Sequence, residues 1–144
     1  MDKKIDCVKN YDATIDDWEL HLTTIFPEAR LKNYIEMRGA DAGNIDHICA
    51  LSAYWVGLIY DNQALNDALE LTKNISVEEL IELRNKVPKE GLNCSVGKNN
   101  IHRLAVDSLE LSKEGLRRRK KLNINKDDES IHLQYLQDLS LIHI

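Results

Sequence analysis

Two residues of opposite charge, Glu36 and Arg38, stand two positions apart in the segment YIEMRGADAG (34–43). Side chains two positions apart in an extended segment project on the same side. A carboxylate can ligate a divalent cation while a neighbouring guanidinium binds an anion, which is what phosphoryl transfer to a carboxylate requires. The small residues that follow leave room for a ligand. An ordinary surface ion pair is the competing interpretation, and the pattern alone favours it.

The element that would position this pair is a strand over residues 31–38. Apolar residues at positions 31, 35 and 37 alternate with polar ones, which is typical of a half-buried strand whose polar face carries Glu36 and Arg38. No partner strand is evident in the sequence, although a single strand is not stable by itself. We therefore expect this strand to be an exposed edge or to lie against helices.

The remainder of the chain predicts helices. Thr14 with Asp17, and Ser76 with Glu79, have the spacing of capping boxes. Apolar residues recur at helical spacing over 101–120, and residues 46–60 are apolar nearly all round, which predicts burial on several sides. We therefore predict an α+β chain that is mostly helical, with six helices and one main strand. Residues 1–144 are expected to form a single portion of a larger domain, with a loose N-terminus over 1–13 and a polar linker over 123–130 before the last helix.

The composition argues against some classes of partner. The 144 residues carry a net charge of −5, which disfavours nucleic acid and anionic membranes, and no apolar stretch reaches the length that spans a bilayer. The basic run LRRRKK (116–121) leaves a nucleic-acid-binding alternative open, but cations at a helix C-terminus explain it more simply. The N-terminal residues do not resemble a signal peptide, and three widely spaced cysteines predict reduced thiols in the cytoplasm.

One long segment is more specific than any of these patterns. The residues DDWELHLTTIFPEARLKNYIEMRGADAG (16–43), followed by ICALSAYWVGLIYD (48–61), look like the C-terminal part of glutamate–cysteine ligase of the plant type. The similarity continues through LRNKVPKEGL (83–92) into the predicted helix at 101–120. This resemblance implies a glutamine-synthetase-like antiparallel sheet around ATP and divalent metals, to which strand 31–38 would belong. By position, Glu36 would be a metal ligand and Arg38 a catalytic residue at the substrate γ-carboxyl and its phosphate.

The resemblance also implies a reaction, cofactors and partners. The complete enzyme would form γ-glutamylcysteine from glutamate and cysteine, the first step of glutathione synthesis, with ATP and Mg²⁺ as cofactors. Most metal and ATP ligands of the family lie in an N-terminal portion outside this chain, so a separate N-terminal fragment is a candidate partner and the chain alone is expected to be inactive. Plant members pair a cysteine at the place of Cys49 with one in that portion. Without that partner, Cys49 is expected to be a reduced, buried thiol.

A function of another class remains open on the sequence alone. The chain would then be a non-catalytic helical remnant, or an interaction module that binds a partner chain. A neighbouring reading frame that encodes the missing sheet would favour a split ligase, and its absence would favour a remnant.

Overall fold

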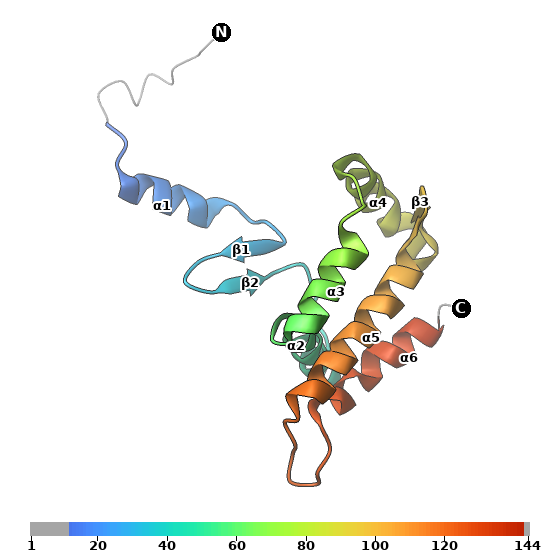
Figure 1. Ribbon diagram of the computed structural model, residues 1–144. Coiled ribbons are helices and arrows are strands. Elements are labelled where there is room, and N and C mark those ends of the chain that lie inside the picture. The colour runs from blue at the N-terminus through green and yellow to red at the C-terminus, as the bar shows by residue number, and fades with distance from the viewer. Residues whose placement is uncertain (1–11, 143–144) are drawn as a thin grey trace. The chain divides into compact units, whose positions relative to one another are not determined.

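The chain divides between Asp41 and Ala42 into an N-terminal unit and a C-terminal unit. The computed structural model describes residues 12–142, and their side chains as far as Leu139 (Figure 1). The loose N-terminus expected over residues 1–13 therefore lies almost wholly outside the described residues. The described chain is mostly helical and contains six α-helices and two small antiparallel strand pairs, as the α+β prediction required.

The N-terminal unit consists of one helix and one β-hairpin. Helix α1 (Ile15–Thr24) begins at the predicted capping box, in which Thr14 and Asp17 bond each other's backbone and side chain. Strands β1 (Ala29–Leu31) and β2 (Ile35–Met37) then pair antiparallel, with Arg30 directly opposite Glu36.

The prediction of one strand over 31–38 is wrong in this region, because the chain reverses inside it. The loop over residues 32–34 is closed by the Lys32 amide, which donates to the Tyr34 carbonyl at 2.8 Å. Leu31 consequently faces Ile35 across the hairpin, so the missing partner strand is β1. A three-residue hairpin loop keeps apolar positions opposite each other, which is why the alternation resembled one continuous strand.

Apolar side chains of the N-terminal unit are largely exposed. None of the residues 12–41 is buried. Leu31 and Ile35 were expected to lie on the half-buried face of a strand, but both side chains are exposed. The large exposed apolar residues are Ile15, Trp18, Leu20, Leu22, Ile25, Phe26, Leu31, Tyr34 and Ile35. A two-stranded hairpin is marginal in water, so these residues form an apolar surface on a weakly stable element.

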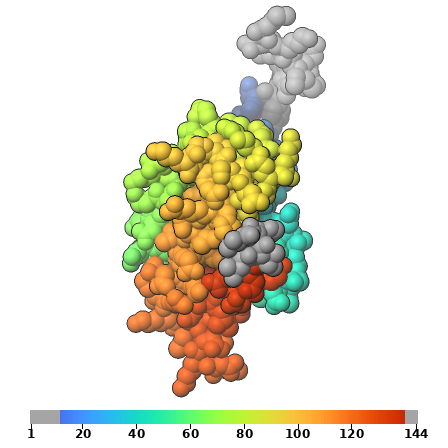
Figure 2. All heavy atoms as spheres, turned by 90° about the vertical axis from the view of Figure 1, so that its right-hand side faces the viewer, coloured from blue at the N-terminus to red at the C-terminus, as the bar shows by residue number. Residues whose placement is uncertain are grey.

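The C-terminal unit is a helical assembly in which α5 contacts several neighbours. Its elements are α2 (Ile45–Ile59), α3 (Asn62–Thr72), α4 (Val77–Glu90), the 3-10 turn η2 (Gly91–Asn93), β3 (Ser95–Val96), β4 (Asn99–Asn100), α5 (Ile101–Arg119), the 3-10 turn η3 (Glu129–Leu133) and α6 (Gln134–Ile142). Helix α5 packs against α2, α3 and α6 (Figure 1). In the space-filling view α5 occupies the centre of one face, with α3 along one edge and α6 beside it (Figure 2).

Side-chain caps begin four of these helices. Asn44 and Asp61 accept hydrogen bonds from the amides of residues 47 and 64, at 2.9 and 2.8 Å, and so fix the starts of α2 and α3. Ser76 and Glu79 form the predicted capping box at α4, and Asn100 caps α5. These caps satisfy amides that have no partner within their own helix.

The core of this unit joins α2, α5 and η3. Its main cluster contains Ala53, Leu109, Leu116 and Leu133, and a second cluster beside α4 contains Leu83, Cys94 and Val96. Helices α2 and α5 cross closely at Gly57 and Gly115, where a Cβ added to Gly115 would lie 2.1 Å from the Gly57 carbonyl oxygen. Only glycine allows the backbones to approach so closely.

Helix α2 is covered on several sides, as predicted, because it packs against α3, α5, α6 and η3. Ala50, Ala53, Gly57 and Leu58 are buried. Ile45 and Ile48 are more than half exposed within the described residues. Among residues 12–142, no helix is long and apolar enough to cross a membrane.

Candidate functional site

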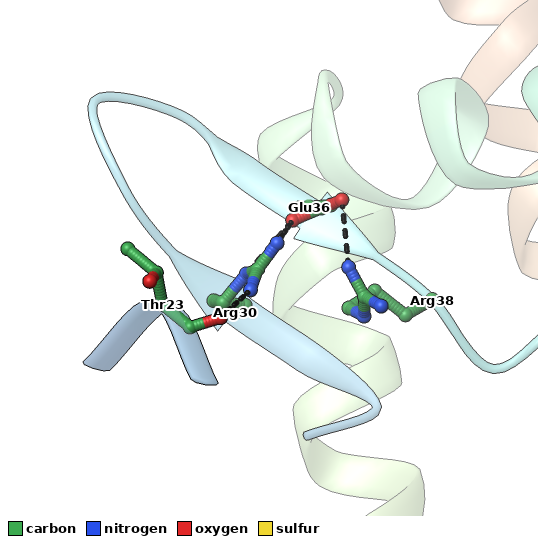
Figure 3. Close-up of polar contacts among 4 residues, drawn as sticks. All are labelled: Thr23, Arg30, Glu36 and Arg38. Carbon is green, nitrogen blue, oxygen red and sulfur yellow. Dashed lines mark hydrogen bonds and ion pairs between the residues drawn. The ribbon is translucent and has the colours of Figure 1, made fainter. Parts of the chain in front are cut away.

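The two residues singled out by the sequence, Glu36 and Arg38, contact each other in the N-terminal unit. Strand β2 carries Glu36, and Arg38 follows the strand directly, so both side chains lie on the same side of the hairpin (Figure 3). The Arg38 Nη1 donates to Glu36 Oε1 at 3.0 Å. The predicted arrangement of an acid and a base side by side is therefore confirmed.

A third residue, Arg30, completes the cluster and was missed in the sequence. It lies opposite Glu36 on β1, and its Nε and Nη2 donate to Glu36 Oε2 at 2.9 and 2.7 Å. Figure 3 shows Arg30 and Arg38 reaching the Glu36 carboxylate from two sides. The sequence could have indicated that Arg30 pairs with Glu36 only if the loop over residues 32–34 had been recognised, because that loop places positions 30 and 36 opposite each other.

The aromatic ring of Phe26 lies next to both guanidinium groups. The Arg38 and Arg30 Cζ atoms stand 4.9 and 5.9 Å from the ring centroid, within the range of cation–π attraction. Phe26 itself is exposed. Residues Phe26, Arg30, Glu36 and Arg38 are called the hairpin cluster below.

The charges of the hairpin cluster favour an anion. Two guanidinium groups surround one carboxylate, which leaves one net positive charge. The hydrogen bond from Arg30, together with the positive charges of Arg30 and Arg38, holds the pKa of Glu36 below its usual range. The carboxylate therefore stays ionised at neutral pH and serves as an anchor for both guanidinium groups.

Donors of Arg38 remain available for a ligand. Among the described residues, its Nε and Nη2 make no hydrogen bond, and 29% of its side-chain surface is exposed. Arg30 is more enclosed, with 12% of its side chain exposed. A guanidinium with free N–H groups suits a carboxylate or a phosphoryl group, which it can bind through two parallel hydrogen bonds.

The cluster can offer one ligand position to a metal ion. The Glu36 carboxylate has about four lone-pair positions and accepts three hydrogen bonds from the two arginines, so one position remains. Within residues 12–142, no group of three or more His, Cys, Asp or Glu side chains could hold a metal ion. Glu36 fits a Mg²⁺ ion as a single ligand, and the other ligands would have to come from elsewhere.

Cys49 occupies a different part of the chain, on α2 in the C-terminal unit. It is a free thiol and half-buried, so the expectation of full burial is wrong. It lines a cavity of about 310 Å³ together with Ile48, Ser52, Ala53, Val56, Leu116, Glu129 and His132. The thiol is partly uncovered, whereas Ala50 and Ala53 of the same helix are buried.

The basic run at the end of α5 is engaged in ion pairs. Its three arginines, Arg117, Arg118 and Arg119, each have an acidic partner: Glu114 at 2.7 Å, Asp61 at 2.7 Å and Glu129 at 3.0 Å. Arg119 also lies over the ring of Tyr60. The three arginines form the last turn of α5, as the simpler interpretation of the sequence required, and their ion pairs also connect α5 to its neighbours.

Comparison with known proteins places nearly the whole chain in one family. The model of glutamate-cysteine ligase family 2 matches residues 2–140. The chloroplastic glutamate–cysteine ligase of Solanum lycopersicum is 48% identical over 119 residues, which are 83% of this chain and 23% of that protein. The chloroplastic enzyme of Arabidopsis thaliana is 48% identical over 116 residues, covering 81% of this chain and 22% of that protein.

The rice relatives agree with these matches. Chloroplastic glutamate–cysteine ligase A of Oryza sativa subsp. indica is 51% identical over 106 residues, or 74% of this chain and 22% of that protein. The chain thus spans about a quarter or less of the length of the curated relatives that it matches. Because these relatives are named chloroplastic, the expectation of a cytoplasmic location is contradicted.

Proposed function

Because the chain belongs to glutamate-cysteine ligase family 2, we propose that it supplies the C-terminal part of an active site that joins glutamate to cysteine. The observation that carries this proposal is the hairpin cluster. It presents an anion-binding guanidinium beside an ionised carboxylate, in a chain that matches the plant ligases at about half of its aligned positions.

The reaction proposed for the complete enzyme has two steps. ATP transfers its γ-phosphoryl group to the γ-carboxylate of glutamate, which gives an acyl phosphate and ADP. The amine of cysteine then attacks the acyl carbon, phosphate leaves, and the amine loses a proton as γ-glutamylcysteine forms. Both steps concentrate negative charge on the phosphoryl oxygens, so a fixed cation beside them lowers the barrier.

In this scheme Arg38 contacts the γ-carboxyl group and its phosphate. Its unused Nε and Nη2 donors match two oxygens of such a group, and Glu36 fixes the guanidinium through Nη1. Glu36 also provides one ligand for Mg²⁺. A Mg²⁺ ion held in part by Glu36 would neutralise part of the negative charge of the ATP phosphates. The positive charge of the hairpin cluster favours a metal ion that arrives together with these phosphates over a bare cation.

The remaining ligands and substrate contacts are assigned to the rest of the ligase. Mg²⁺ requires close to six oxygen ligands, and Glu36 offers one. The isolated 144-residue chain should therefore form no γ-glutamylcysteine from glutamate, cysteine and ATP. The names of the relatives favour a plastid as the site of the complete enzyme, which fractionation with an antibody against this chain would test.

Complementation in trans tests the proposal. The part of the tomato ligase that lies outside the matched segment would be co-expressed with this chain, and product formation measured by chromatography. We expect activity only when both pieces are present. Continued absence of product from a stable complex of the two pieces would contradict the proposal.

Variants of the reconstituted enzyme then assign the roles of the two residues. Arg38→Lys keeps the charge but loses the planar fork, so turnover should fall by about 100-fold or more without rescue by Mg²⁺. Glu36→Gln should lower activity and recover partly at high Mg²⁺, because a carboxylate ligand is lost. The matched control is Arg103→Lys on α5, where the arginine is exposed and far less constrained. Near-normal turnover in both cluster variants would refute the assignment.

A binding function of another class is supported by one observation. The apolar side chains of residues 12–41 are largely exposed, and such a surface is typical of segments that pack against another polypeptide. As a non-catalytic interaction module, the chain would bind the remaining part of a ligase and yield no activity with it. The co-expression experiment separates the two functions, because complex formation without product supports the module.

A further inference from the structure

We propose that Arg30 is a positioning residue that fixes the Glu36 carboxylate and, through it, the guanidinium of Arg38. This inference rests on the proposed function only in the role given to Arg38. The arrangement of the three side chains can be tested without any ligase activity.

Each nitrogen of the Arg30 guanidinium has a partner. Two of them, Nε and Nη2, donate to the same oxygen of Glu36, and Nη1 donates to the Thr23 carbonyl at 3.1 Å. The Thr23 carbonyl is one of the last four of α1, which have no amide partner within the helix. Arg30 therefore ties the end of α1 to β2 while it holds Glu36.

Arg38 depends on this arrangement indirectly. Within the described residues, the one hydrogen bond of its guanidinium goes to Glu36 Oε1, the oxygen that Arg30 leaves free. If Glu36 rotated about its χ angles, Arg38 would lose its polar anchor and keep only the Phe26 ring. Arg30 limits that rotation because two donors from one rigid fork meet a single carboxylate oxygen.

The two arginines thus have different tasks. Arg30 is more enclosed and lies on the opposite strand, and three of its five N–H groups already donate to Glu36 and Thr23, so it has less to offer a ligand. Arg38 is more exposed and retains two donor nitrogens. A substrate anion would meet Arg38, and its approach angle would be set by Arg30 through Glu36.

The test uses the 144-residue chain and NMR of labelled arginine side chains. The variants are Arg30→Gln and Arg30→Lys. The control is Lys32→Gln, which removes the same charge from the hairpin loop, where Lys32 acts on Glu36 through its charge and not through a hydrogen bond. The quantity measured is the exchange rate with water of the Arg38 Nη1 protons, because Nη1 is the nitrogen that donates to Glu36 Oε1.

In Arg30→Gln, the Arg38 Nη1 protons should exchange faster, although Arg30 does not bond Arg38. Arg30→Lys should not restore the slow exchange, because it keeps the charge but lacks the fork. Lys32→Gln should leave the Arg38 exchange rate unchanged.

Several results would overturn the proposal. One is an Arg38 Nη1 exchange rate that is the same in all variants, and another is a rate that rises equally in Arg30→Gln and in Lys32→Gln. Cross-strand contacts between Ala29 and Met37 report whether the hairpin persists. If Arg30→Gln loses these contacts, the hairpin has unfolded and the test relies on Arg30→Lys. In a folded Arg30→Lys hairpin, fast Arg38 exchange supports the inference. An exchange rate equal to that of the parent chain refutes it. Failure of the ligase proposal would leave these measurements unaffected.

Discussion

Replacement of Asp61 tests how the C-terminal unit is held together. This residue has two roles, because its carboxylate caps α3 through the amide of Ala64 and also binds Arg118 of α5. The Arg118 Nε and Nη2 approach the carboxylate at distances from 2.7 to 3.2 Å. Asp61→Ala removes both interactions, whereas Asp61→Asn retains the cap and loses the ion pair.

The expected losses follow from these contacts. An N-cap contributes about 1 kcal/mol to the free energy of unfolding. The ion pair should contribute about 1 to 2 kcal/mol to the free energy of unfolding. This is at the low end of the range for hydrogen bonds between charged groups, because the Arg118 side chain is 35% exposed and solvent screens the interaction. Asp61→Ala should therefore cost about 2 to 3 kcal/mol and lower the melting temperature by about 10 to 15 °C. Asp61→Asn and Arg118→Gln should each cost about half as much.

Urea denaturation followed by Trp55 fluorescence measures these losses, in a Trp18→Phe background so that only the C-terminal unit reports. A double-mutant cycle between Asp61→Asn and Arg118→Gln should give a coupling free energy of about 1 kcal/mol. Equal losses for Asp61→Ala and Asp61→Asn, or no coupling to Arg118, would refute the reasoning.

The same carboxylate makes a prediction about pH. Hydrogen bonds from Arg118 and from the Ala64 amide lower the pKa of Asp61 in the folded chain. The unfolded state then binds the proton more tightly, so the stabilisation is complete above the unfolded-state pKa, about 3.9, and is lost as the pH falls through the folded value. The stability difference between the parent and Asp61→Asn should therefore shrink on acidification.

Two further predictions concern the same unit. Gly115→Ala should lower the free energy of unfolding by about 1 to 3 kcal/mol in urea denaturation, because its Cβ would lie 2.1 Å from the Gly57 carbonyl oxygen; an unchanged midpoint would contradict the close crossing. In a chain whose first cysteine is replaced by serine, Cys49 should react with a thiol reagent well before Cys94. Cys94 is fully buried and its burial raises the pKa of its thiol; equal rates in the folded chain would argue against this packing.

Local features of the fold were predictable because their signals are local. The capping boxes at Thr14 and Ser76 were recognised from residue types three positions apart, and the structure contains both. The long helix expected at 101–120 is α5, one residue shorter. These elements depend on periodicity and on side chains that bond their own backbone, which a single segment specifies.

Pairing across the chain was not predictable in the same way. The loop over 32–34 contains neither glycine nor proline, and Asn33 is its one residue of a type common in turns, so only a weak turn signal divides the apparent strand 31–38. Arg30 could not be assigned without the register that places it opposite Glu36. The pair Glu36 and Arg38 was identified because a two-residue spacing brings its members together on any extended segment. Their assigned roles came from the family resemblance rather than from the residues alone.

The arginines at the end of α5 show how a helix distributes charge. Each residue of an α-helix is turned by about 100° from the one before it, so three in succession leave the axis in three directions. Here those directions lead to an acid on α5 itself, to the residue that begins α3, and to η3. A stretch that is strongly basic along the sequence is therefore dispersed in space and largely neutralised by its neighbours. The electric field that a polyanion would meet at this end of the helix is weaker than a count of consecutive positive residues implies.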